Sequence, residues 1–175
     1  MANVWQREDS GWVRRPLSEA LFTLVTRSRA ARHPMASAEA GAPVMLRRCG
    51  DAKSALWVLI SSGAEKVHVN GQPLLAGLCV LRDRDEIQIG AQSRFYYSTE
   101  ELARVEPYPG GEGPVFCARC RQEIKAGSPA VRCPACGHWC EQSESKPCWT
   151  YGPACPMCDQ PTDFDTGLRW TPEDL

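Results

Sequence analysis

The sequence predicts a mainly β N-terminal sandwich followed by a small cysteine-rich domain, and three observations favour this division. Several short apolar runs with turns between them fill residues 43–98, a spacing typical of a small sandwich or barrel. Of the 10 cysteines, only Cys49 and Cys79 precede residue 117. A Pro- and Gly-rich stretch at 105–115 cannot continue a helix or a central strand. We therefore expect a first domain over residues 1–104, a linker over 105–115 and a second domain over 116–175.

The apolar runs of the first domain are expected to be strands. "ALWVLIS" (55–61) is nearly continuous, which predicts a strand that is buried on both faces. "KVHVNGQPLL" (66–75) alternates and then turns at Asn70-Gly71, a strong hairpin signal because both residues tolerate positive φ. The other expected strands lie within 43–49, 77–81, 85–90 and 94–98.

The first 42 residues carry weaker signals. Residues 16–25, "PLSEALFTLV", fit a strand or a short helix, and the hydrophobic periodicity does not decide between them. Residues 26–43 are polar and rich in small side chains, which predicts a loop. We interpret its Arg27, Arg29 and Arg32 as a solvated face, because acidic residues elsewhere balance them.

Charge and hydropathy exclude several classes of partner. The net charge of −1 argues against strong attraction to nucleic acid or to an anionic membrane. No apolar run is long enough to span a bilayer, and the N-terminal segment lacks the features of a secretory signal. We therefore expect a cytoplasmic protein. Because thiols stay reduced in the cytoplasm, the dense cysteines indicate metal binding before disulfides.

The cysteines of the second domain have the spacing of zinc ligands. Three C-x-x-C pairs occur, and two further cysteines lie between the second and third pairs. A C-x-x-C turn places both sulfurs on one side of a tight loop, as two corners of a zinc tetrahedron. The eight thiolates suffice for two Zn²⁺ ions, which leaves His138 spare unless it displaces one of the cysteines. The cysteines are Cys117, Cys120, Cys133, Cys136, Cys140, Cys148, Cys155 and Cys158.

Two pairings of these eight ligands are open. A sequential order would build one site from the first four cysteines and the other from the last four. An interleaved order would join the first pair to Cys140 and Cys148, and the second pair to the third. We favour the interleaved order, because the four-residue step from Cys136 to Cys140 suits a chain that passes directly between two sites.

The four-ligand zinc sites and the acidic charge of the second domain exclude two classes of function. Four-ligand zinc sites have no open position for water, so they are structural, which argues against a zinc hydrolase. From residue 114 on, eight acidic residues exceed six basic ones, and eight thiolates outweigh two zinc ions. An acidic domain of this kind is a poor nucleic-acid binder. Protein binding is the class that remains.

With those residues in place, residues 115–160 resemble a RING finger, specifically the RING-like domains of bacterial ubiquitin-like conjugation systems. The features that carry the resemblance are the interleaved pairs, "CW" at Cys148-Trp149 and the closing "CPMC" at 155–158. The resemblance implies a cross-braced α+β domain with two Zn²⁺ ions. The implied ligands are Cys117, Cys120, Cys140 and Cys148 for the first zinc, and Cys133, Cys136, Cys155 and Cys158 for the second.

The same resemblance implies a RING-type E3-like ligase. Such a module binds an E2-like enzyme and promotes transfer of a ubiquitin-like protein to lysine without a covalent intermediate of its own. If neighbouring genes encode a ubiquitin-like protein and E1-like and E2-like enzymes, the resemblance suggests an antiviral-defence context. The implied E2-binding residues are Ala118, Arg119, Trp149, Pro156 and Met157. The alternative for Trp149 is that it fills the small core of the domain.

This sequence departs from the RING pattern at two of its positions. Arg119 replaces an apolar residue, and Asp159 stands where many such ligases carry a cationic linchpin, a role that Arg169 could take over. The alternative function is a noncatalytic zinc-binding adaptor, which the missing linchpin favours.

The first domain carries a second resemblance. Residues 67–90, "VHVNGQPLLAGLCVLRDRDEIQIG", resemble the second half of a forkhead-associated (FHA) domain, with its "VNG" turn and "DEI-x-IG" strand. The resemblance implies an FHA-like β-sandwich. The Gly-Arg and Ser-x-x-His of phosphothreonine readers do not occur here, so phosphate recognition is not implied. We expect a protein-binding or assembly module that docks a substrate or an E1-like or E2-like partner.

Overall fold

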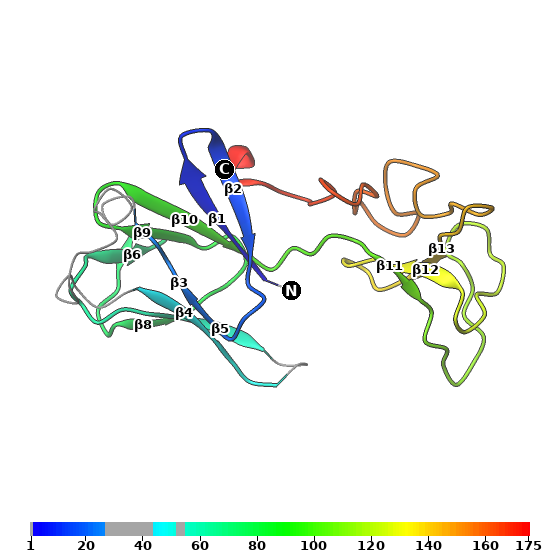
Figure 1. Cartoon of the computed structure of the whole chain (residues 1–175), viewed down its shortest axis with the longest axis horizontal. Coiled ribbons are helices and arrows are strands. Elements are labelled where there is room, and N and C mark those ends of the chain that lie inside the picture. Colours follow the sequence, from blue (N-terminus) through cyan, green and yellow to red (C-terminus); the bar gives the residue numbers. More distant parts are fainter. Residues whose placement is uncertain (1, 27–43, 52–54) are drawn as a thin grey trace, which may run out of the picture. The chain divides into compact units, whose positions relative to one another are not determined.

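The structure is a computed structural model of the chain, and it describes residues 2–26, 44–51 and 55–175. Two compact units divide it, Met1–Thr99 and Glu100–Leu175. The described residues form β-strands and one short 3₁₀ turn, η1 (Pro172–Asp174), which confirms a mainly β protein (Figure 1). No helix in the described part of the chain has the length and apolar character needed to cross a bilayer.

The first unit contains a six-stranded antiparallel sheet in the order β2-β1-β10-β9-β6-β7. Its first strand pairs with its last, so the two ends of the unit meet in one sheet. The hairpin of β1 and β2 lies in a part of the chain where no strand was predicted. The strands are β1 (Asn3–Glu8), β2 (Gly11–Pro16), β6 (Val67–Val69), β7 (Gln72–Pro73), β9 (Glu86–Ile89) and β10 (Ser93–Ser98).

A four-stranded antiparallel sheet in the order β3-β4-β5-β8 completes the first unit. Within residues 16–25 the structure has a strand, which resolves the open choice between strand and helix. The strands expected between 43 and 98 are confirmed in both sheets. Of the predicted loop at 26–43, only Thr26 is among the described residues, so Arg27, Arg29 and Arg32 lie outside them. The strands are β3 (Leu21–Thr23), β4 (Met45–Cys49), β5 (Leu56–Ile60) and β8 (Leu78–Val80).

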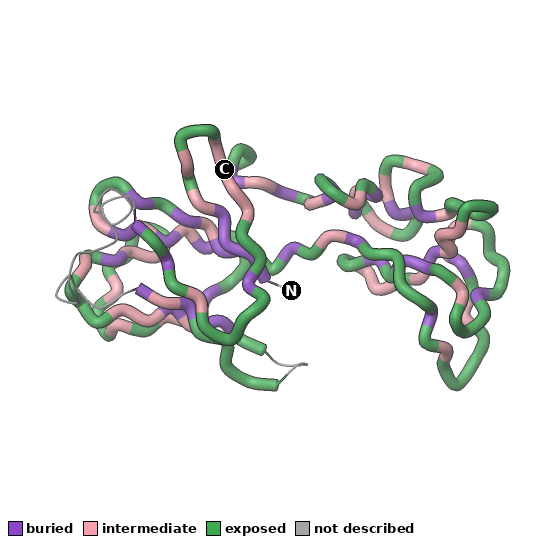
Figure 2. The backbone as a smooth tube through the Cα atoms, in the orientation of Figure 1, coloured by how far each residue is buried: buried purple, intermediate pink, exposed green. Residues whose placement is uncertain are grey.

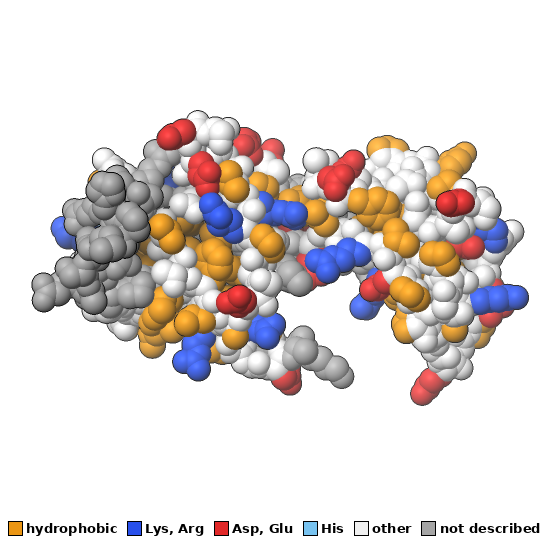
Figure 3. Space-filling model, in the orientation of Figure 1, with side chains coloured by type: hydrophobic (Ala, Val, Ile, Leu, Met, Phe, Trp, Pro, Cys, Tyr) orange, Lys and Arg blue, Asp and Glu red, His pale blue; other side chains and the backbone are white. Residues whose placement is uncertain are grey.

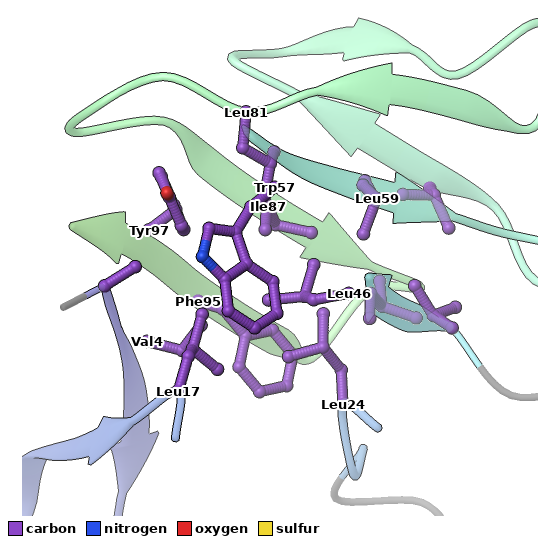
Figure 4. Packing of buried hydrophobic residues seen from close by; sticks show 14 residues of the cluster. Val4, Leu17, Leu24, Leu46, Trp57, Leu59, Leu81, Ile87, Phe95 and Tyr97 are labelled. Carbon is purple, nitrogen blue, oxygen red and sulfur yellow. The ribbon is translucent and has the colours of Figure 1, made fainter. Parts of the chain in front are cut away.

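Both sheets contribute to one hydrophobic core. Val4 and Phe95 come from the first sheet, and Leu46, Trp57 and Leu59 come from the second. Figure 4 shows the Trp57 indole among these side chains. Burying a large aromatic side chain of this kind stabilises a domain by roughly 3 kcal/mol.

The prediction that residues 55–61 are buried on both faces is wrong. Trp57 and Leu59 are buried, but Leu56, the first residue of β5, is 53% exposed, and Val58 and Ile60 are only partly buried. Burial therefore alternates along β5, as it does in a strand with one face on the core. The alternation of buried and less buried segments is visible along the tube in Figure 2.

The Asn70-Gly71 turn between β6 and β7 is confirmed. Asn70 and Gly71 have φ values of 51° and 75°, the positive pair that a type I′ hairpin requires. The Asn70 Nδ2 donates to Asp85 Oδ1 at 2.8 Å, and the Glu86 N–H donates to Asn70 Oδ1 at 2.9 Å. The turn is thereby fastened to the start of β9.

The second unit contains a three-stranded antiparallel sheet of β11 (Val105–Pro107), β12 (Pro129–Arg132) and β13 (Trp139–Glu141). The segment 105–115, expected as a linker, thus contributes β11 to this unit. Its prolines are tolerated because β11 is an edge strand. The expected α component of this domain is not found: residues 100–175 contain strands, turns and η1 but no α-helix. Closely spaced cysteine turns and short hairpins take up the chain instead.

Candidate metal centre

The three C-x-x-C pairs lie on three hairpins that share one geometry. In each hairpin, the residue before the first cysteine pairs with the residue three positions after the second cysteine. This offset is the same for all three pairs. The flanking pairs are Phe116↔Glu123, Arg132↔Trp139 and Ala154↔Pro161.

A repeated backbone hydrogen bond closes each of these turns. The N–H of Cys117, Cys133 and Cys155 donates to the carbonyl oxygen five residues later, at 2.8 Å in all three. In the first two turns the residue after the second cysteine, Arg121 or Gly137, has a positive φ of 59° or 76°. A left-handed residue at this point bends the chain back, so that both cysteines of a pair can face one point.

The second and third turns bring four sulfurs together. The sulfur atoms of Cys133, Cys136, Cys155 and Cys158 all lie within 4.8 Å of one another. Cys133 Sγ is 3.6 Å from Cys158 Sγ, and Cys136 Sγ is 3.8 Å from Cys155 Sγ. A regular tetrahedron with Zn–S bonds of about 2.3 Å has S···S edges of about 3.8 Å. The four thiols therefore fit a zinc ion without rearrangement.

The first turn is joined by a cysteine from further along the chain. The sulfurs of Cys117, Cys120 and Cys148 lie within 4.8 Å of one another. Cys140, the fourth expected ligand, is outside this group of three, but it is fully buried, and the Cys117 sulfur contributes to the rise of its pKa.

Two contacts hold Cys140 beside the first turn. The Ala118 N–H donates to the Trp139 carbonyl at 2.9 Å, and the Glu141 N–H lies 3.4 Å from Cys117 Sγ. These contacts come from the residues before and after Cys140 on β13. The strand that ends the second turn thus also forms a wall of the first cluster.

The sulfur atoms group in the interleaved order and not in the sequential one. The first pair meets Cys148, which lies beyond the second pair in the sequence, and the second pair meets the third. The chain therefore passes from one cluster to the other and back. Loss of either cluster would release segments that the other one does not hold.

Several thiols in the two clusters have shifted pKa values. Burial raises the pKa of Cys133, Cys140 and Cys148 to about 12 in each case. Burial opposes ionisation at Cys136 too, but hydrogen bonds from the backbone and ring of His138 lower its pKa to about 6. Sulfurs packed this closely cannot all ionise without a cation among them. His138 thus interacts with the sulfur of Cys136, one of the expected ligands.

Trp149, expected on the partner surface, lies in the core of the second unit. Its side chain has no exposed area, and its Nε1 donates to the Thr162 carbonyl at 2.8 Å. The indole is large enough to fill the small space between the cysteine turns, and its one polar atom is satisfied there. Trp149 cannot touch a partner, so this expectation is wrong.

The other expected partner residues lie at the surface to different degrees. Pro156 is exposed and Met157 is 53% exposed in the third turn, whereas Ala118 is partly buried. Arg119 is held by the protein itself. Its Nε donates to the Cys148 carbonyl at 2.7 Å and its Nη2 to the Ala154 carbonyl at 3.0 Å.

Tyr151 is a surface residue that the sequence reasoning missed. Its ring is 78% exposed, and the Arg119 guanidinium lies 5.5 Å from the ring centroid. No local pattern in the sequence distinguishes its exposed position from the buried position of Trp149. Tyr151 and Arg119 line a cavity of about 320 Å³ beside the first cluster. The other lining residues are Cys120, Gln122, Lys146, Pro147 and Cys148.

The residues at and after the position where RING ligases carry the cationic linchpin supply no free positive charge. Asp159 is exposed, and Gln160 is buried with its Nε2 donating to the Gly167 carbonyl at 2.6 Å. Arg169, the expected replacement, donates from Nε and Nη2 to Glu100 Oε1 at 3.0 and 2.8 Å. The Glu100 carboxylate is almost fully buried, so this ion pair holds Arg169 in place.

Comparisons with known proteins give no family for this chain. No protein-family model matches the sequence, and no curated protein matches it either. Among solved structures, the chain is similar to the crystal structure of the Slr1951 protein from Synechocystis sp., at 19% sequence identity and a TM-score of 0.42. That similarity covers 58% of this chain and 100% of the other. A likeness at this level carries no argument, so the function must be argued from the residues of the site.

Proposed function

We propose that the second unit is a two-zinc module that docks a protein partner, and that this partner is an E2-like enzyme carrying a ubiquitin-like protein. The interleaved grouping of the cysteine sulfurs is the observation that carries the proposal. It supports a cross-brace in which Cys117, Cys120, Cys140 and Cys148 hold one zinc and Cys133, Cys136, Cys155 and Cys158 hold the other.

The zinc ions would have a structural role in this module. Zinc with four protein ligands has no open coordination position, and its thiolates are not free to act as nucleophiles. What the metal supplies is folding free energy, on the order of 10 kcal/mol per site, to a unit whose apolar core is small. The module would therefore act by holding surfaces in place.

The docking surface would be the cavity beside the first cluster together with the third turn. Tyr151 and Arg119 supply an exposed aromatic ring over a cation, and Pro156 and Met157 supply an apolar edge. Aromatic residues, Met and Arg are enriched at protein interfaces. A ligase of this type accelerates transfer by restraining the thioester-linked tail, without a covalent intermediate of its own.

The first unit would be an FHA-like sandwich that recruits a substrate or an E1-like or E2-like partner. Two antiparallel sheets around a common core support this assignment, as does the Asn70-Gly71 turn fastened to Asp85.

A noncatalytic adaptor is the second candidate for the whole protein. The residues that follow the third turn favour it, because Asp159 is acidic and Arg169 is held by Glu100. An adaptor would bind the E2-like enzyme through the same surface without accelerating transfer.

A discharge assay separates the two candidates. The zinc-loaded protein is added to an E2-like enzyme, taken from its gene neighbourhood, that carries the thioester-linked ubiquitin-like protein, and lysine-dependent loss of the thioester is followed. A ligase accelerates this loss, and Tyr151→Ala or Met157→Ala lowers the acceleration by about 10-fold or more. Leu75→Ala, at a 91% exposed side chain of the first unit, is the matched control. Binding without acceleration identifies an adaptor, and no binding to the E2-like enzyme refutes both.

A further inference from the structure

The outer face of the β3-β4-β5-β8 sheet is built largely from aliphatic side chains. Paired residues of an antiparallel sheet point to the same face, and the register Leu21↔Arg47↔Val58↔Val80 forms one row across all four strands. Ile60 pairs with Leu78 in the next row. We call this surface the aliphatic face: Leu21, Leu56, Val58, Ile60, Leu78 and Val80, with Arg47 among them.

Several side chains of the aliphatic face are exposed over half of their area or more. The exposed fractions are 50% for Leu21, 58% for Leu78 and 50% for Val80. Hydrophobic side chains gather over β3, β4 and β5 in Figure 3. Contiguous exposed apolar patches on monomeric proteins mark sites of interaction.

The outer face of the other sheet gives the contrast within the same unit. There Arg94 forms an ion pair with Glu86 at 2.8 Å, and Trp12 packs edge-on against Tyr96. Charged and amphipathic side chains of that kind tolerate water. The aliphatic face is therefore a local property of one sheet and not a general feature of the unit.

Arg47 defines the chemistry of an occupant. It is exposed in the middle of the first row, between Leu21 and Val58, and no carboxylate of the described residues pairs with it. A partner that covers the aliphatic neighbours would also remove water from the guanidinium, which is costly unless a carboxylate accepts its hydrogen bonds. The occupant must therefore supply an apolar stripe with an Asp or Glu near its centre.

We infer that the aliphatic face binds an amphipathic helix of a partner protein that carries an acidic residue within its apolar stripe. A sheet face is buried by a helix or by another sheet, and the described part of this chain has no α-helix to cover it. A helix presents apolar residues at i, i+3, i+4 and i+7 on one side and can hold one carboxylate among them.

A second copy of the chain is a poorer occupant. Two-fold docking of this face on itself would bring two Arg47 guanidinium groups together in a desolvated interface. The inference rests on the docking role proposed for the first unit. It adds which surface binds the partner and what kind of segment the partner presents.

The test uses the full zinc-loaded chain and two designed fluorescent peptides as probes. Both peptides have Leu at i, i+3, i+4 and i+7; one carries Glu at the centre of the stripe and the other carries Lys. Fluorescence anisotropy should show that the Glu peptide binds about 5-fold or more tightly than the Lys peptide. Arg47→Glu should reverse this order, and Arg14→Glu on the outer face of the other sheet should not.

Leu78→Asp and Leu56→Asp should each weaken both peptides, with circular dichroism used to show that each variant retains its strands. Equal affinity for the two peptides, or no binding of either, overturns the inference. So does self-association of the wild-type chain in sedimentation that Leu78→Asp abolishes, because a second copy is then the occupant. Tyr151→Ala should bind the Glu peptide like the wild type, so this result is independent of the discharge assay on the second unit.

Discussion

At the scale of single residues, the second unit separates two aromatic side chains that lie almost side by side in the sequence. Trp149 is fully buried with its Nε1 bonded to the Thr162 carbonyl, whereas Tyr151 is 78% exposed beside Arg119. The first holds the unit together and the second is available to a partner.

Trp149→Ala should lower the free energy of unfolding of the zinc-loaded protein by about 3–5 kcal/mol, since it removes a core indole and leaves a cavity. Tyr151→Ala, the matched control, should change it by less than about 0.5 kcal/mol. Thermal and denaturant unfolding measure both effects. Similar losses in the two variants would contradict the assignment of Trp149 to the core and Tyr151 to the surface.

Asn70 stabilises the turn between β6 and β7 through both its side chain and its backbone conformation. Its side chain bonds to Asp85 and to the Glu86 N–H, and its backbone has a positive φ. Asn70→Ala should lower the free energy of unfolding, measured with denaturant, by about 1–3 kcal/mol. The part-buried Asp85 carboxylate loses a hydrogen-bond donor, and Ala tolerates this positive φ poorly. Gln72→Ala, on the exposed strand β7, is the control and should unfold at the wild-type denaturant midpoint.

At the scale of elements, β5 shows that a run of apolar residues predicts a strand but not which of its faces is buried. The strand itself was predictable, because five apolar residues in a row with turns on either side favour one. Its one-sided burial was not, since burial depends on what covers the outer face of the sheet. Leu59 faces the core and is fully buried, while Leu56 is 53% exposed on the other face.

Leu59→Ala should therefore lower the free energy of unfolding by about 2–5 kcal/mol. Leu56→Ala, the same change on the opposite face of the same strand, should lower it by about 1 kcal/mol or less. Denaturant unfolding of the first unit, followed by its far-ultraviolet dichroism, measures the difference. Equal costs would mean that the outer face is buried in solution.

The same reasoning explains which elements of the fold were predictable. The cysteine turns follow from ligand spacing, which is local, so the metal-binding residues could be read from the sequence. The β1-β2 hairpin could not, because Trp5 and Trp12 lie on the outer face of their sheet and obscure the alternation of apolar and polar residues. The orientation of Trp149 was equally hidden, since nothing local decides which residue after Cys148 turns inward.

At the scale of the whole molecule, two units of similar size depend on different sources of stability. The core of Met1–Thr99 consists of aliphatic and aromatic side chains from two sheets. The core of Glu100–Leu175 contains cysteines of both clusters around Trp149. A core of the second kind should depend on the metal, because thiolates packed together repel one another without a cation.

Removal of zinc should therefore unfold the second unit alone. After addition of a strong chelator, hydrogen exchange followed by mass spectrometry should show loss of protection in β12 and β13, while β4, β5, β9 and β10 keep theirs. Native mass measurement should show two zinc ions before chelation and none after, and restored zinc should restore protection.

Cys79→Ala, outside both clusters, should keep two ions, whereas Cys133→Ser should lose at least one. Loss of protection in β4 and β5 together with β12 and β13 would contradict independent cores, and a single ion in the untreated protein would contradict the interleaved two-zinc arrangement itself.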